Sequence, residues 1–409
     1  MSVVTEQQGH GGVSFAQDEE TRLILDSIDD FIEQEVKPLE DELGETFDNP
    51  RLSNEADGAV VPEVQEAADE VRRKSAEAGF YAMNMPEEYG GEGVSNVTWY
   101  RATRHVSEKG RGLHELMLAG PEGPKPLLLQ AEGEQVEKYL EPCIRGEKTT
   151  AFGLTEPSVG SDAPSMKTTA EKDGDEWVLN GSKQWITNAP HCDFAQIFAR
   201  TTPVEDAGRY GGITCFIVES DEFELGSYNN AVGLEGRQAE ILLNDVRIPE
   251  DRVLGTQDGA FYNAMSFLSL GRLELGARAV GLSRNLLDLC KEYANEREAF
   301  GKPIGEYQQV STKVAKGRAR NYTADSAGLR LAWQMDEGQQ TVEESSIFKW
   351  YATDTLWQIA DDAVQIHASS GLSEDNPFMD HLHIARVLRV VEGTDEIQLN
   401  TVAKQNGLL

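Results

Sequence analysis

A chain of 409 residues is longer than one ordinary domain, so two or three packed units are expected. Its 71 acidic side chains outnumber its 37 basic ones, which gives a formal net charge of -34. This balance argues against nucleic acid and against an anionic membrane as partners, because both require clustered lysine and arginine.

The acidic surface suggests adaptation to a high-salt cytoplasm, although an acidic surface without that role is the simpler alternative. The N-terminus lacks the basic and apolar regions of a signal peptide, and no run of ~18 apolar residues occurs, so we expect a cytoplasmic protein. The four cysteines form no Cys-x-x-Cys pair, so we expect neither a metal site nor a disulfide framework.

The first part of the chain, residues 1–150, is predicted to be a helical domain. Apolar residues recur at helical spacing over 21–43, and a second helical stretch covers about 63–78. Residues 44–62 are polar and contain glycine, asparagine and proline, so they are interpreted as a loop. The stripe of the first helix comprises Leu23, Ile24, Ile28, Phe31, Ile32, Val36 and Leu39.

Residues 151–250 have the pattern of a β domain. Asp173-Gly174 separates two strand-like runs, which is typical of a hairpin. Further strands are expected at 194–200, 213–219 and 240–243, with the short spacings of an antiparallel sheet. We therefore expect a central antiparallel β-barrel or sandwich.

Helical periodicity returns over residues 251–409. One apolar stripe runs from Leu275 to Tyr293 and another from Phe348 to Ala363, and Thr341 with Glu344 suggests a capping box. Helices of this length predict a C-terminal four-helix bundle. The expected fold class is α+β, in three successive domains.

Two segments of the β region have the composition of a ligand site. Residues 152–162 contain glycine, serine and threonine, so their backbone could approach a flat polar ring closely, although a simple turn is the alternative. Trp185 and Thr187 lie two residues apart, on one side of a strand, and the indole is either a stacking surface or a core residue. Neither a Rossmann fingerprint nor a P-loop is present.

Two further segments complete the pattern. Residues 297–304, Arg-Glu-Ala-Phe-Gly-Lys-Pro-Ile, lead to Gln308, and residues 391–398 read Val-Glu-Gly-Thr-Asp-Glu-Ile-Gln. All four segments, in this order and at this spacing, resemble the acyl-CoA dehydrogenase family from about residue 60 onward. The resemblance implies bound FAD, an acyl-CoA substrate, electron-transfer flavoprotein as acceptor, and a homotetramer built from two dimers.

The resemblance also assigns roles to individual residues. Around the flavin and its attached groups it places Phe152, Thr155, Gly160, Ser161, Trp185, Thr187, Thr394 and Glu396. The adenine and pyrophosphate end would be completed by a neighbouring subunit through Arg297, Phe300, Gln308 and Gln365, where a guanidinium suits phosphate oxygens. Substrate contacts would come from Ser161, Arg272 and Gly393.

Glu392 is the predicted catalytic base, because the family motif places its carboxylate at this Glu-Gly-Thr. A neighbouring apolar pocket could raise its pKa toward that of a useful base. Some family branches carry the base where Gly271 stands here, and glycine cannot abstract a proton. Arg272 would either position the base and thioester or form a buried structural ion pair.

The implied reaction removes an α-proton from an acyl thioester while FAD accepts hydride from the β-carbon, giving a trans-2-enoyl-CoA. The alternatives are an acyl-CoA oxidase or monooxygenase on the same fold, and a DNA-binding or non-catalytic member of the family. The net charge argues against DNA, and a scaffold would not need Glu392, Trp185 and Arg297 together.

Overall fold

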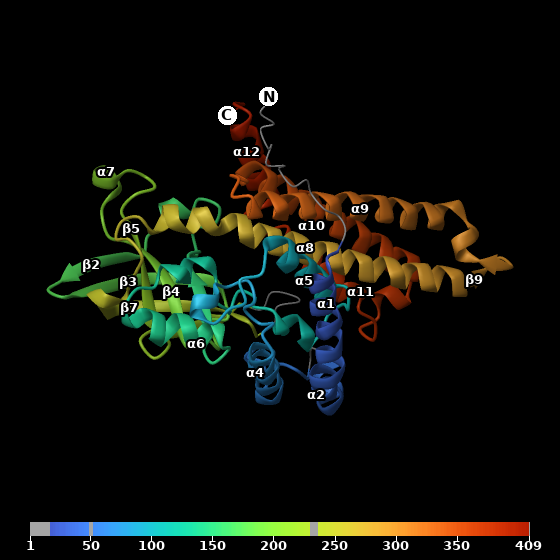
Figure 1. Cartoon of the computed structure of the whole chain (residues 1–409), viewed down its shortest axis with the longest axis horizontal. Helices are drawn as coiled ribbons and strands as arrows, with labels where there is room; N and C mark the ends of the chain where they lie inside the picture. Colours follow the sequence, from blue (N-terminus) through green and yellow to red (C-terminus); the bar gives the residue numbers. More distant parts are fainter. Residues whose placement is uncertain (1–16, 49–51, 230–235, 409) are drawn as a thin grey trace, which may run out of the picture.

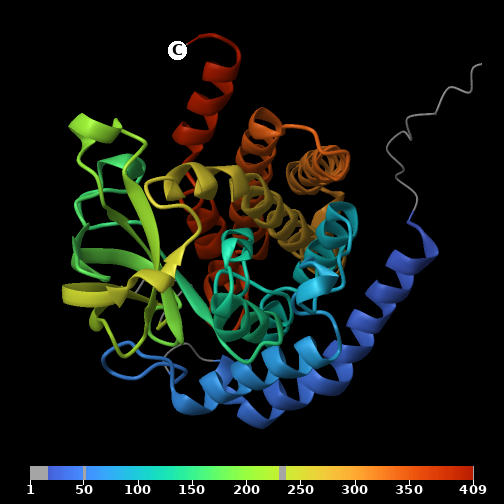
Figure 2. The same ribbon diagram turned by 60° about the vertical axis from the view of Figure 1, so that its left-hand side comes forward.

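The computed structural model describes residues 17–48, 52–229 and 236–408. Figure 1 shows a sheet at one end of the long axis and a set of long helices that extends to the other end. Figure 2 shows the N-terminal helices along a third side of the molecule. The order of helical region, sheet and helices agrees with the expected α+β class.

The N-terminal region begins with a nearly continuous helix. Asp18 caps it by accepting a hydrogen bond from the Thr21 amide, at 2.6 Å. Four residues of the predicted apolar stripe are buried and two are partly buried, whereas Leu23 is 55% exposed. Residues 44–62 are less irregular than expected, since they contain a short helix and a bridge between Asn54 and Val60. The α-helices and π-helical turns of this region are α1 (Glu19–Phe31), η1 (Ile32–Val36), α2 (Lys37–Leu43), α3 (Glu45–Asp48), α4 (Pro62–Glu77), α5 (Asn96–Ser107), η5 (Val136–Leu140) and α6 (Glu141–Ile144).

The central sheet has the strand order β6-β7-β3-β2-β4-β5-β8, with β1 paired to β4. In the described part of the chain this path is open, so the sheet fits a sandwich better than a closed barrel. Most neighbours are antiparallel, but β1 and β2 each run parallel to β4, which the sequence did not predict. The strands are β1 (Thr150–Gly153), β2 (Thr169–Asp173), β3 (Glu176–Thr187), β4 (Phe194–Arg200), β5 (Ile213–Glu219), β6 (Glu224–Tyr228), β7 (Gln238–Pro249) and β8 (Val253–Leu254).

The predicted hairpin is confirmed by the pairing of Asp173 with Glu176. Only Gly174 and Asp175 lie between these paired residues, and Gly174 has a φ of 67°. Glycine is the residue that adopts this left-handed conformation at least cost, which explains the turn.

The C-terminal helices pack around one apolar core, and the apolar residues of both predicted stripes form part of this core or pack against it. The predicted capping box is wrong, because Thr341 is the N-cap residue but its side chain accepts no capping hydrogen bond. No helix in the described ranges is long and apolar enough to cross a membrane. The helices are α8 (Ala260–Glu296), α9 (Gln308–Asp336), α10 (Val342–His367), α11 (Phe378–Leu388) and α12 (Asp395–Gln405), and a small hairpin of β9 (Glu298–Ala299) and β10 (Lys302–Pro303) joins α8 to α9.

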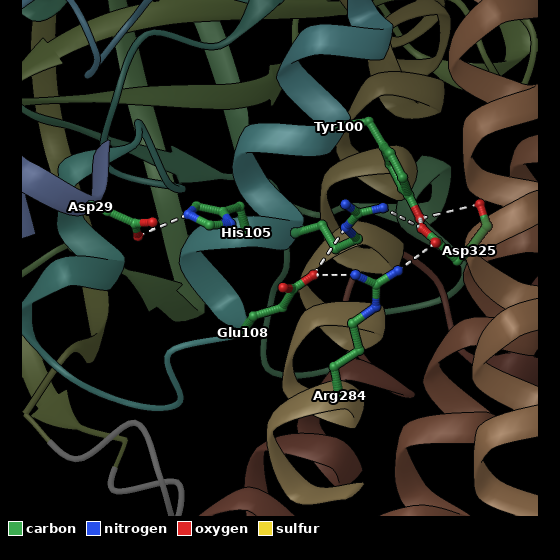
Figure 3. A network of polar contacts seen from close by, with 7 residues as sticks. Asp29, Tyr100, His105, Glu108, Arg284 and Asp325 are labelled. Atoms are coloured by element: carbon green, nitrogen blue, oxygen red, sulfur yellow. Dashed lines mark hydrogen bonds and ion pairs between the residues drawn. The ribbon is translucent and has the colours of Figure 1, made fainter. Parts of the chain in front are cut away.

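A polar network connects the N-terminal region to these helices (Figure 3). Asp325 on α9 accepts hydrogen bonds from Tyr100 Oη at 3.0 Å, Arg104 Nη1 at 2.8 Å and Arg284 Nη2 at 2.6 Å. The same two arginines also contact Glu108, so positive and negative charges alternate. The network therefore fixes α5 against α8 and α9, which positions the loop that follows α5.

We expect Asp325→Asn to lower the free energy of unfolding by about 2 kcal/mol or more. The change removes the shared counter-charge of two arginines, and breaking a fully buried pair costs ~3–5 kcal/mol, reduced here by partial solvent access. Chemical denaturation would measure the loss. Asp288→Asn is the matched control, because its ion pair with Arg318 is exposed and should contribute within about 0.5 kcal/mol. Equal effects of the two substitutions would contradict a structural role for the network.

Candidate active site

The β-domain part of the site presents two aromatic side chains to solvent. Phe152 is 38% exposed and Trp185 is 50% exposed, so Trp185 is not a core residue. Thr155 and Thr187 lie between buried and exposed, whereas Gly160 and Ser161 are exposed. A β-carbon built on Gly160 would meet nothing within 4 Å, so the backbone there is open to close approach.

Trp185 is turned outward by an irregularity in β3. The register between β3 and β7 shifts between Lys183 and Ile186, and Trp185 has a φ of 61°. A bulge of this kind redirects a side chain. The adjacent Gln184 amide donates to the Thr155 carbonyl at 2.9 Å, which ties the two predicted segments together. Thr187 Oγ1 accepts from Gln238 Nε2 at 3.1 Å, which links the site to β7.

A buried ion pair that sequence reasoning missed supports this region. Lys183 Nζ lies 2.8 Å from Glu156 Oε1, and neither side chain is more than 4% exposed. Glu156 also accepts hydrogen bonds from the amides of Lys167 and Thr168, at 2.7 and 2.9 Å. The pair therefore fixes both ends of the loop that carries Gly160 and Ser161. The alternation of β3 could have indicated that Lys183 points inward.

Glu392 lies in a tight turn between α11 and α12. Glu392 and Gly393 have φ values of 56° and 92°, and this strained geometry is held from outside the turn. Gln398 Nε2 donates to the Glu392 carbonyl at 2.9 Å, and Lys349 Nζ donates to the Gly393 carbonyl at 2.8 Å. Lys349 and Gln398 are fully buried, and sequence reasoning missed both. Thr394 begins α12 as its N-cap.

The surroundings of Glu392 suit a base. Its side chain has exposed surface, yet burial raises its pKa above the ordinary value, helped by the negative charge of Glu274. The residue thus keeps contact with water while its carboxylate lies close to the backbone of α8 at Gly271. Three positive charges lower the pKa of Glu392 and so limit its rise: Lys125, Arg272 and Lys349. The carboxyl therefore has positive charges near it, although no residue in the described ranges forms a salt bridge with it.

Two residues of α8 lie next to this carboxylate. A β-carbon built on Gly271 would lie 3.0 Å from Glu392 Oε2, so the absence of a side chain at Gly271 leaves room for the carboxylate. Arg272 is buried and makes no salt bridge within the described ranges, unlike the structural ion pair considered above. Arg272 Nη1 instead donates to Ser346 Oγ at 3.2 Å. Its charge therefore remains available to act on Glu392 or on a ligand.

The remaining predicted cofactor residues lie elsewhere. Arg297, Gln308 and Gln365 are exposed, and Phe300 is 97% exposed beside β9, at the end of the molecule opposite the sheet (Figure 1). Gln308 borders a surface cavity of about 660 Å³ lined by residues of α9 and α10, and Glu392 is not among its lining residues. One chain thus does not bring the two predicted sets together. Glu396 is exposed on α12.

The residues fit a bound flavin. Exposed aromatic surface, hydroxyl groups and open backbone around Trp185 match a flat ring with a polar edge. Glu392 supplies a carboxylate of raised pKa, which is suited to removing a proton from carbon. No cluster of three or more histidine, cysteine or acidic residues that could hold a metal occurs in the described ranges.

Three family models cover most of the chain: the acyl-CoA dehydrogenase N-terminal domain matches residues 18–147, the middle domain 151–246 and the C-terminal domain 258–406. The chain is 34% identical to 3-(aryl)acrylate reductase of Clostridium sporogenes, over 94% of this chain and 98% of that protein. It is 34% identical to an acyl-CoA dehydrogenase of Bacillus subtilis, over 85% and 93%. The structure of butyryl-CoA dehydrogenase from Megasphaera elsdenii is similar with a TM-score of 0.83, at 28% identity over 96% of this chain and 99% of that chain.

Proposed function

Because the chain belongs to the acyl-CoA dehydrogenase family and is thus an FAD-dependent oxidoreductase acting on CH-CH groups, we propose that Glu392 is its catalytic base. The observation that carries this proposal is a carboxylate of raised pKa, held by a strained turn beside a glycine of α8. A base of this kind is effective when its pKa is near the working pH.

In the proposed reaction Glu392 takes a proton from the α-carbon of an acyl-CoA thioester. The C–H bond electrons form the new double bond as hydride leaves the β-carbon, and the product is a trans-2-enoyl-CoA. Bound FAD supplies the hydride acceptor. Arg272 and the Gly393 backbone would orient the thioester, and Ser161 would contact the CoA moiety or the flavin.

The proposed flavin contacts are divided between two chains. Phe152, Thr155, Gly160, Trp185 and Thr187 would surround the ring in one subunit, with Thr394 and Glu396 nearby. Arg297, Phe300, Gln308 and Gln365 would complete the dinucleotide in a neighbouring subunit, because Arg297 and Phe300 flank β9, which lies at the end of the molecule opposite the sheet (Figure 1). This division supports an oligomer, for which we propose a homotetramer.

Electron-transfer flavoprotein is the proposed electron acceptor, and oxygen is the alternative.

A second candidate activity is reduction of an aryl-substituted enoyl thioester, which the 34% identity to an arylacrylate reductase favours. The reduction would involve the same two carbon atoms, with protonated Glu392 returning a proton to the α-carbon and an external electron donor supplying the two electrons through the flavin. We also propose that the three domains meet near residues 150 and 250, that the enzyme acts in β-oxidation, and that its acidic surface is an adaptation to high salt.

Anaerobic titration of the purified yellow protein with acyl-CoA thioesters tests the function. We expect one class of thioester to bleach the flavin, because hydride transfer removes its oxidised absorption. Air should restore the colour slowly and with little peroxide, whereas rapid peroxide formation would favour the oxidase. A colourless protein that takes up no FAD would contradict the proposal.

A further inference from the structure

One face of α8 runs from the proposed base to a group of charged residues. Glu274 and Arg278 follow Gly271 by three and seven residues, and this spacing places all three on the same side of a helix. Gly271 lies beside Glu392, and Glu274 Oε2 accepts from Lys125 Nζ at 2.7 Å. At about 1.5 Å per residue, Arg278 lies ~10 Å further along the helix than Gly271.

Arg278 belongs to a cluster at the end of this face. It forms an ion pair with Glu115, whose other oxygen lies 2.8 Å from Arg111 Nε. Arg111 Nη1 is buried without a hydrogen-bond partner. His381 of α11 faces the same charges with its buried Nε2 unpartnered, and burial lowers its pKa to about 4, so it is neutral at pH 7. Arg111 Nη1 is therefore a buried donor without an acceptor, whereas His381 Nδ1 donates to the Pro377 carbonyl and its Nε2 is an unpartnered acceptor.

Arg237 reaches this cluster from the β domain. A chain of hydrogen bonds fixes its backbone: its carbonyl accepts from the Asn188 amide at 2.7 Å, Asn188 Nδ2 donates to Thr150, and the Thr150 amide donates to the Glu122 carbonyl. The Arg237 guanidinium lies within electrostatic range of Glu122, Arg111, Glu115 and Arg278, but forms no salt bridge within the described ranges. It is partly accessible to solvent, like Glu392.

The charges of this cluster do not balance. Arg111 and Arg278 share the single carboxylate of Glu115, and among the described residues that influence Arg237 three arginines stand against Glu115 and Glu122, one positive charge in excess. A cation partly removed from water and without a counter-charge is unfavourable. A planar guanidinium binds carboxylate through paired hydrogen bonds, so an anionic ligand group would relieve the imbalance.

We propose that this arginine cluster binds a carboxylate at the far end of the acyl chain, so that the substrate is the CoA thioester of a dicarboxylic acid. The α-carbon would lie at Glu392, and the chain would follow the Gly271, Glu274 and Arg278 face to Arg237. A simple fatty acyl chain would leave the Arg237 guanidinium without a partner and place methyl groups among charges. This inference rests on the proposed function for the position of the thioester.

The test compares matched thioesters on the holoenzyme. Glutaryl-, adipyl- and suberyl-CoA would be paired with valeryl-, hexanoyl- and octanoyl-CoA, and both binding, from the shift of the flavin spectrum, and bleaching rate would be measured. We expect the best dicarboxylic thioester to exceed its monocarboxylic partner at least tenfold in kcat/KM. Arg237→Gln should reduce that ratio at least tenfold, while Arg247→Gln, an exposed arginine of β7, should leave it unchanged.

The outcomes separate the two proposals. Tighter binding of dicarboxylic thioesters without bleaching would support the specificity and contradict the proposed reaction. Equal or tighter binding of the monocarboxylic series by the native enzyme would overturn the specificity, whatever the bleaching rates. An unchanged ratio in Arg237→Gln, with flavin retained, would overturn the role of Arg237.

Discussion

Glu392→Gln should reduce flavin bleaching by acyl-CoA by roughly 10²-fold or more, the usual consequence of removing a general base. Glutamine keeps the size of the side chain but accepts no proton. The backbone hydrogen bonds from Gln398 and Lys349 should persist, because they involve the carbonyls of Glu392 and Gly393. Flavin content and thioester binding should therefore remain. Anaerobic stopped-flow absorbance would measure the rate.

Glu250→Gln is the control for this substitution, because Glu250 is an exposed acid that pairs with Lys172 on the β domain. Its bleaching rate should equal that of the native protein. A Glu392→Gln protein that bleaches at the native rate, with saturating thioester, would show that another group removes the proton.

Lys349→Met should slow bleaching by about tenfold or more and shift its pH dependence. The substitution deletes the buried donor to the Gly393 carbonyl, and a hydrogen bond from a charged group contributes ~1.5–3 kcal/mol. Burial lowers the Lys349 pKa to about 8, so the ammonium is charged at lower pH and favours ionised Glu392 there. Its loss should raise the pKa of Glu392 further, which moves the acid limb of the rate to higher pH.

We expect Glu274→Gln to shift the pH dependence of bleaching in the opposite direction. The Glu274 carboxylate is the second cause of the raised pKa of Glu392, so its removal should move the acid limb to lower pH. A purely structural role for Lys349 would lower stability and rate without moving that limb. Bleaching rates measured from pH 5 upward for the three proteins would distinguish these cases, and limbs at one common pH would contradict the electrostatic account.

The fold was largely predictable because its signals are local. Apolar stripes identified the long helices, and an Asp-Gly turn identified the β2–β3 hairpin. One error concerns interactions between distant segments, and the other concerns a local side-chain hydrogen bond. The parallel pairing of β1 and β2 with β4 depends on connections that a local pattern does not contain, and Thr341 has a capping sequence without the capping bond.

The site was predictable where its residues form contiguous motifs, as around Trp185 and Glu392, although their roles remain predictions. The residues that sequence reasoning missed contact the site from distant positions in the chain. Lys349 is 44 positions from Gly393 and adjoins a recognised apolar stripe, but lysine is rarely fully buried, so its residue type gives no signal of a buried role. The convergence of Arg111, Arg237 and Arg278 is likewise a property of the folded chain alone.

The placement of Arg297 and Phe300 at the far end from the sheet has a consequence for coenzyme retention (Figure 1). If neighbouring chains share each dinucleotide, an isolated chain offers only part of the contacts. Release of the yellow coenzyme would then follow dissociation of the assembly, and would depend on how dilute the protein is. Colour would be lost before either chain unfolds.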